Sequence, residues 1–172
     1  NIVIGGRIGP FVAATAPISS KRARVDLYVL RDDLLEPLGS TADLNVVEDV
    51  AVVDLDGDGL AEILAVGAGR LALLRWSGRL EVFETVNLSA DRSPRVAAAS
   101  HGGEVWVAVA DYEAPDQGDT GRSIVSLYTA RDGSLQPLRR LDIHGHIGDL
   151  LFADLVSGGT PELLLETGTG EE

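Results

Sequence analysis

Short runs of apolar residues, many of them alternating with polar residues, recur along the chain and are separated by turns rich in Gly, Asp and Pro. Alternation with a period of two is typical of β-strands, and the turn residues mark where the strands end. No segment has the apolar spacing of a long amphipathic helix. The pattern therefore predicts an all-β protein, with strands near 2–5, 11–15, 24–31, 34–38, 48–54, 62–67, 70–76, 80–86, 94–99, 104–111, 123–130, 134–142, 148–154 and 162–167. Tight hairpin turns are expected at 31–33, 77–78 and 132–133.

Two distant parts of the chain resemble each other when the sequence is shifted by 100 residues. Residues 25–38 then align with 125–138 without a gap, and eight positions are identical. Further identical pairs in this alignment are Asp49 and Asp149, Asp54 and Asp154, Leu55 and Leu155, Gly59 and Gly159, Glu62 and Glu162, and Leu64 and Leu164. A looser copy covers 70–86. The shift thus corresponds to two units of about 50 residues, which is the length of one four-stranded propeller blade.

An acidic loop lies between two short apolar segments, 50–53 and 63–66, that have the composition of strands. Its carboxylates occupy positions 1, 3, 5 and 9 of the loop, at Asp54, Asp56, Asp58 and Glu62. Oxygen ligands at alternate positions of a tight loop suit a hard divalent cation, above all Ca²⁺. The loop is not an EF-hand, because position 12 is Ala65 instead of a bidentate Glu and because the flanks are not helical.

This loop resembles that of the FG-GAP/VCBS repeats, which build integrin-α-like β-propellers and carry D-x-D-x-D-G-x-x-D between two strands of a blade. Here Glu62 stands in place of the last Asp of that motif. The resemblance implies one structural Ca²⁺, held by the side chains of Asp54, Asp56, Asp58 and Glu62 and by the carbonyl of Leu60. The alternative is an acidic turn that binds no metal. Four carboxylates so close together repel one another, which favours the cation.

The strand map and the resemblance together predict β-propeller blades of four antiparallel strands, with about three and a half blades in this chain. The blades are expected at 1–43, 44–90 and 91–144, with a half blade at 145–172. A ring needs about four to eight blades, so this chain is not expected to close a propeller by itself. Either a second copy of the chain or the missing part of a longer precursor is expected to complete it.

A second loop, at 154–162, keeps the turn but not the ligands. Asp154 and Glu162 remain, whereas Val156 and Gly158 replace the two middle carboxylates. Two carboxylates are too few for an oxygen cage around Ca²⁺, so we expect no metal there.

Charge and composition restrict the class of partner. The net charge is −13, which disfavours nucleic acid and anionic membrane surfaces. The chain has no Cys, and no segment approaches the ~20 apolar residues of a membrane helix. It begins at Asn1 and contains no Met, which predicts a piece of a longer precursor. An extracellular or cell-surface location is expected, with the signal peptide outside this chain. Asn87-Leu88-Ser89 matches the N-glycosylation acceptor.

The sequence contains no recognisable catalytic set. Gly-x-Ser-x-Gly, P-loop and His-Glu-x-x-His motifs are all missing. His144-Gly145-His146 is either a loop before a strand or a pair of ligands for a transition metal. We therefore expect no enzyme, but a calcium-stabilised extracellular propeller that binds a protein or a glycan, as in adhesion or a surface structure. The alternative is the scaffold of a propeller-type polysaccharide lyase or hydrolase, because propellers host many chemistries.

Overall fold

The computed structural model describes residues 3–4, 11–19, 22–41, 44–89, 92–114, 121–156 and 159–168. These residues form strands and turns, and none of them lies in a helix. Every pairing between the named strands is antiparallel. The expectation of an all-β protein is confirmed. Within the described ranges there is also no helix of the length and apolar character that crossing a membrane requires.

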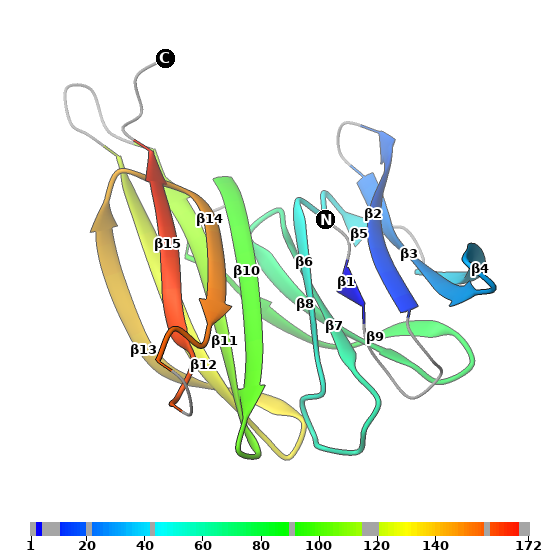
Figure 1. Ribbon diagram of the computed structural model, residues 1–172. Helices are drawn as coiled ribbons and strands as arrows, with labels where there is room; N and C mark the ends of the chain where they lie inside the picture. Colours follow the sequence, from blue (N-terminus) through cyan, green and yellow to red (C-terminus); the bar gives the residue numbers. More distant parts are fainter. Residues whose placement is uncertain are drawn as a thin grey trace.

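The strands form four sheets that follow one another along the chain (Figure 1). The first sheet consists of β1 (Val3–Ile4), β2 (Phe11–Ser19), β3 (Arg22–Arg31), β4 (Leu34–Ser40) and β5 (Leu44–Asn45). The second consists of β6 (Asp49–Val53), β7 (Glu62–Gly67), β8 (Arg70–Trp76) and β9 (Leu80–Asn87). The third consists of β10 (Arg92–His101), β11 (Glu104–Glu113), β12 (Arg122–Arg131) and β13 (Ser134–His144). The fourth contains β14 (His146–Ala153) and β15 (Glu162–Gly168).

These strands match the fourteen predicted ones, and β5, a short strand paired with β3, is the addition. The tight turns are confirmed too, since Asp32, Asp33, Gly78, Asp132 and Gly133 all have positive φ values. Non-glycine residues adopt this left-handed backbone rarely, and Asp tolerates it better than most. The glycine-rich segment 5–9, for which the sequence predicts a further hairpin turn, lies outside the described residues.

Successive sheets pack face to face because the middle strands are apolar on both sides. In β7, Ile63 and Ala65 join a core shared with the first sheet, whereas Leu64 and Val66 join a core shared with the third. Alternate side chains of a strand point to opposite faces, so β7 contributes to two cores and is buried at all six positions. The same division holds in β11, where Val107 faces the second sheet and Ala108 the fourth.

The first strands of the later sheets lie side by side, with β10 packed against both β6 and β14 (Figure 1). A buried carboxylate links two of them: Asp49 at the start of β6 is 2 % exposed. Its Oδ1 accepts from the N–H of Val50 at 2.8 Å, and its Oδ2 accepts from the N–H of Val96 on β10 at 2.9 Å. The described strands do not close into a ring or a barrel.

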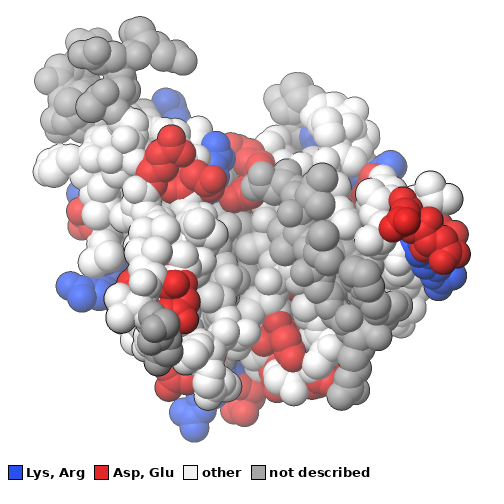
Figure 2. All heavy atoms as spheres, in the orientation of Figure 1, with Lys and Arg blue, Asp and Glu red and all other residues white. Residues whose placement is uncertain are grey.

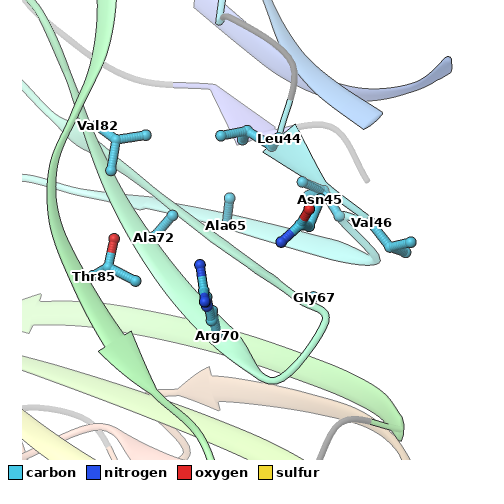
Figure 3. A pocket seen from close by; sticks show the side chains of 10 residues that line it. Leu44, Asn45, Val46, Ala65, Gly67, Arg70, Ala72, Val82 and Thr85 are labelled. Atoms are coloured by element: carbon cyan, nitrogen blue, oxygen red, sulfur yellow. The ribbon is translucent and has the colours of Figure 1, made fainter. Parts of the chain in front are cut away.

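A small hollow marks the contact between β5 and the second sheet (Figure 3). Its lining is Leu44, Asn45, Val46, Val47, Ala65, Gly67, Arg70, Ala72, Val82 and Thr85. Gly67 is required there, because a Cβ at this position would lie 1.8 Å from the carbonyl oxygen of Val46. Most of the lining is small or apolar, so the hollow reflects sheet packing and contains no acid–base pair.

The link between Asp49 and Val96 gives a direct test of sheet packing. Asp49→Asn leaves one oxygen for Val50 and turns an amide NH₂ toward the N–H of Val96, so two donors face each other in a buried place. We expect a loss of about 1–3 kcal/mol in the free energy of unfolding, measured by urea denaturation. Asp149→Asn is the matched control, because Asp149 makes the same bond to its own neighbour Leu150 but is exposed. Equal losses in the two variants would contradict the role of the inter-sheet bond.

Candidate metal loop

The acidic loop connects β6 to β7 and lies where the second and third sheets meet. Val53 ends β6 and Glu62 begins β7, so the loop spans 54–61. Gly57 and Gly59 have φ values of 75° and 83°, a backbone conformation that glycine adopts without steric cost. These two residues let the chain reverse within a few residues. The sequence therefore allows a compact turn here.

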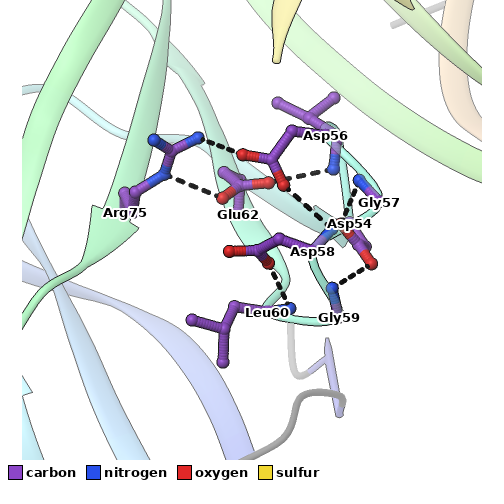
Figure 4. Close-up of polar contacts among 9 residues, drawn as sticks. Asp54, Asp56, Gly57, Asp58, Gly59, Leu60, Glu62 and Arg75 are labelled. Atoms are coloured by element: carbon purple, nitrogen blue, oxygen red, sulfur yellow. Dashed lines mark hydrogen bonds and ion pairs between the residues drawn. The ribbon is translucent and has the colours of Figure 1, made fainter. Parts of the chain in front are cut away.

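The aspartates hold the turn in shape by accepting backbone hydrogen bonds (Figure 4). Asp54 accepts from the N–H of Gly57 at 2.8 Å and from that of Gly59 at 2.9 Å. Asp56 accepts from the N–H of Asp58 at 3.1 Å, and Asp58 accepts from the N–H of Leu60 at 2.6 Å. Each carboxylate is thus directed toward the inside of the turn by the chain that follows it.

Three of the predicted ligands converge. Asp54, Asp56 and Asp58 each place one carboxylate oxygen within 4.8 Å of the others. Oxygens that share one Ca²⁺ lie at most about 5 Å apart, because each is about 2.4 Å from the ion. The spacing and the hard oxygen donors therefore fit Ca²⁺. Asp54 is half-buried, and Asp56 and Asp58 are exposed.

Glu62, the fourth predicted ligand, is not a member of this group. Glu62 is the first residue of β7, and its side chain is 1 % exposed. Oε2 accepts from the N–H of Leu55 at 2.9 Å, and Oε1 accepts from Nε of Arg75 at 3.0 Å. The fifth predicted ligand, Leu60, lies in the loop and donates its N–H to Asp58.

Arg75 is the residue that the sequence reasoning missed. Its Nη2 lies 2.8 Å from Oδ2 of Asp56, so one guanidinium binds Asp56 and Glu62 together (Figure 4). The guanidinium also lies 4.7 Å from the ring centre of Phe83 on β9. The pairing of β7 with β8 could have indicated this contact. Ile63 pairs with Leu74, so in this antiparallel hairpin Arg75 stands opposite Glu62.

Burial of Glu62 and its pairing with Arg75 explain two pKa shifts. Burial raises the pKa of the Glu62 carboxyl above its ordinary value of 4.5, and the bonds from Leu55 and Arg75 offset part of this increase. The hydrogen bond to Glu62 raises the pKa of the Arg75 guanidinium, and the charges of Glu62, Asp56 and Asp58 add to the effect. Arg75 therefore stays charged, and it is the cation that Glu62 requires in its buried position.

The loop also touches the third sheet. A hollow beside it is lined by Asp54, Asp56 and Gly57 of the loop and by the hairpin turns at 100–103 and 130–132. A Cβ placed on Gly133 would lie 3.3 Å from Cβ of Asp56. A change in the position of the loop would therefore alter its packing against the hairpin turns of the third sheet.

The second loop repeats one hydrogen bond of the first, but at an exposed position. The N–H of Leu155 donates to Oε2 of Glu162 at 3.0 Å, as the N–H of Leu55 does to Glu62. Among the described residues, neither Asp154 nor any His belongs to a group of three metal-ligating side chains. His146 instead packs edge-on against Tyr112, with ring centres 5.1 Å apart.

A scan against protein-family models finds no match for this chain, and a search of curated proteins finds no relative. The resemblance to FG-GAP/VCBS repeats therefore rests on the residues of the loop and of the internal alignment.

Arg75→Ala tests the charge balance of the loop. The substitution leaves the buried Glu62 without its cation, and we expect a loss of about 1–3 kcal/mol in the free energy of unfolding at pH 7. Since burial raises the pKa of Glu62 in the folded state, protonation removes the penalty, and the loss should shrink as the pH falls toward 4.5.

The control for this variant is Arg79→Ala. Arg79 is 80 % exposed, and its ion pair is with the exposed side chain of Glu81, so the loss on substitution should stay within about 0.5 kcal/mol. Urea denaturation at several pH values measures both. If the loss of unfolding free energy in Arg75→Ala did not change with pH, Arg75 would not be the counter-ion of Glu62.

Proposed function

We propose that this protein is a calcium-stabilised extracellular β-propeller module that binds a protein or a glycan and takes part in adhesion or in a surface structure. The proposed role is non-enzymatic. The observation that carries it is the convergence of three aspartate oxygens within 4.8 Å in a loop between two packed sheets. A Ca²⁺ there would be held by Asp54, Asp56 and Asp58 and by the carbonyl of Leu60.

Charge supports a divalent ion in this loop. Four carboxylates gather at 54–62, and Arg75 supplies one positive charge, which Asp56 and Glu62 share. Asp54 and Asp58 accept only backbone N–H groups in the bonds described above. A cation with two charges would reduce their mutual repulsion. Glu62 would become a ligand only if Arg75 released it, so its proposed part is to fix the loop from the buried side.

The sheet arrangement supports propeller blades. Three sheets have a run of four antiparallel strands in chain order, and β6, β10 and β14 lie next to one another as the inner strands of blades do. The first and third sheets also share a register irregularity at the same place, Leu27/Tyr28 and Leu127/Tyr128. We propose blades at 1–43, 44–90 and 91–144, a half blade at 145–172, and completion by a second copy or by more of the same precursor.

The surface favours partners other than nucleic acid. On the face drawn in Figure 2, acidic side chains form several separate groups, and the basic side chains in view lie mostly near the edge of the molecule. With a net charge of −13, this surface fits a glycan or a protein with basic groups better than a phosphate backbone.

Calcium should stabilise the fold through this loop. At a free Ca²⁺ concentration of about 100 times Kd, mass action adds about 2.7 kcal/mol to the free energy of unfolding. Calorimetric titration and thermal melting with and without a chelator measure the effect. Asp56→Ala should abolish it, and Asp154→Ala should leave it unchanged. Identical melting curves with Ca²⁺ and with chelator would refute the structural metal.

Assembly should be visible in solution. If copies complete each other's propeller, sedimentation at low micromolar concentration should give a mass above the 18.1 kDa of one chain. The association should involve apolar sheet faces and therefore persist in high salt. A stable monomer in the presence of Ca²⁺ would argue against completion by a second copy.

A further inference from the structure

Arg75 reaches the acidic loop from β8 and holds two carboxylates at once (Figure 4). Its Nη2 donates to Oδ2 of Asp56 at 2.8 Å, and its Nε donates to Oε1 of Glu62 at 3.0 Å. The two contacts differ in their access to solvent, since the side chain of Glu62 is 1 % exposed and that of Asp56 is 24 % exposed. The guanidinium is therefore anchored at a buried carboxylate and extends to one that ions in solution can reach.

The contact between Arg75 and Asp56 lies against the turn that joins β12 to β13. A Cβ placed on Gly133 would lie 3.3 Å from Cβ of Asp56 and 3.5 Å from Nη2 of Arg75. Glycine at this position leaves room for both groups. Arg75 thus fixes Asp56 next to the third sheet through contacts that involve protein groups alone.

A calcium ion in this loop would compete with Arg75 for Asp56, which is one of the three converging carboxylates. The ion would lie about 2.4 Å from a ligand oxygen, so the ion and Nη2 of Arg75, bound to the same carboxylate, would be roughly 4–7 Å apart. Repulsion between a double and a single positive charge at ~6 Å corresponds to roughly a tenfold loss of affinity, even in water. One of the two cations therefore has to give way at Asp56.

Loss of a proton from Arg75 does not relieve this repulsion. The hydrogen bond to Glu62 raises the pKa of the guanidinium, and the charges of Glu62, Asp56 and Asp58 add to the effect. Because Arg75 stays charged, only a movement of its side chain can separate the two cations. That side chain is 41 % exposed, so the end that holds Asp56 has space to move, whereas the end that holds Glu62 is buried with it.

We propose that Arg75 is the resident counter-ion of the acidic loop and sets its affinity for Ca²⁺. The ion displaces Nη2 of Arg75 from Asp56, while Nε keeps its bond to Glu62. Arg75 therefore neutralises the loop when calcium is scarce and lowers the affinity for the ion. This inference rests on the proposed calcium site, and it names the residue that regulates that site.

Calorimetric titration of the whole chain with Ca²⁺ tests the competition. Arg75→Gln should lower Kd roughly tenfold, because the competing charge is removed. Arg75→Lys keeps the charge, so its Kd should lie closer to that of the unaltered chain than to that of Arg75→Gln. The matched control is Arg79→Gln, which removes the same charge from a side chain that is 80 % exposed and screened by solvent, and it should leave Kd unchanged.

Two results of this titration would overturn the inference. One is a Kd for Arg75→Gln that equals or exceeds that of the unaltered chain. The other is an equal gain of affinity in Arg79→Gln, because net charge alone would then account for the effect.

The unaltered chain provides a measurement that does not depend on the folding of a variant. NMR follows the guanidinium N–H groups of an arginine, and their exchange with solvent slows when they are hydrogen-bonded. On saturation with Ca²⁺, exchange at Nη2 of Arg75 should become faster, whereas the Nε–H group should stay protected by Glu62. Unchanged protection of Nη2 in the calcium-bound chain would show that the ion displaces nothing, and the inference would fail.

The same titrations separate this inference from the proposed calcium site. If the unaltered chain binds Ca²⁺ and Arg75→Gln binds it no more tightly, the inference fails and the proposed metal stands. If only Arg75→Gln binds Ca²⁺, the inference stands and the proposed structural metal fails. If neither chain binds the ion, both proposals fail.

Discussion

The structure depends on sheets that are apolar on both faces and must therefore be covered on both. The second sheet shows the consequence most clearly, because β7 sends Ile63 toward the first sheet and Leu64 toward the third. A sheet of this composition is not stable with one side in water, since each exposed leucine or valine forgoes roughly 1.5–3 kcal/mol of burial. Face-to-face stacking in chain order follows from this requirement. On the fourth sheet, Leu151 is 57 % exposed, in contrast to the buried leucines of the second sheet.

Charge is arranged around this apolar framework at a few fixed points. Asp49 ties β6 to β10 by accepting a backbone N–H from the neighbouring sheet, which satisfies a donor that would otherwise be buried alone. Glu62 fixes the start of the acidic loop through Leu55 and is neutralised by Arg75. The loop thus contains three converging aspartates and is joined at its end to a buried carboxylate, Glu62, that is paired with the partly exposed Arg75. Because it also contacts the hairpin turns of the third sheet, the electrostatics of the loop and the packing of two sheets are coupled.

The aligned carboxylates of the second and fourth sheets have the same short-range hydrogen bonds but different long-range partners. Asp149 and Glu162 make the same short-range bonds as Asp49 and Glu62, to Leu150 and Leu155. They differ in their long-range partners: Asp49 receives an N–H from β10 and Glu62 receives Arg75 from β8. Local sequence therefore places a carboxylate, and the neighbouring strand decides whether it becomes a structural tie. The aligned leucines differ in the same way, since Leu64 is buried between two sheets and Leu164 is 37 % exposed.

The sequence by itself determined the strands, the tight turns and the convergence of Asp54, Asp56 and Asp58, because alternation, positive-φ turn residues and ligand spacing act within a few residues. It did not determine that Glu62 lies outside that group, since this depends on Arg75, thirteen residues away on another strand. The bond between Asp49 and Val96, 47 residues apart, was equally invisible. Such contacts are decided only when sheets pack, because burial selects the partner of a charged group from whatever the tertiary structure brings within hydrogen-bonding distance.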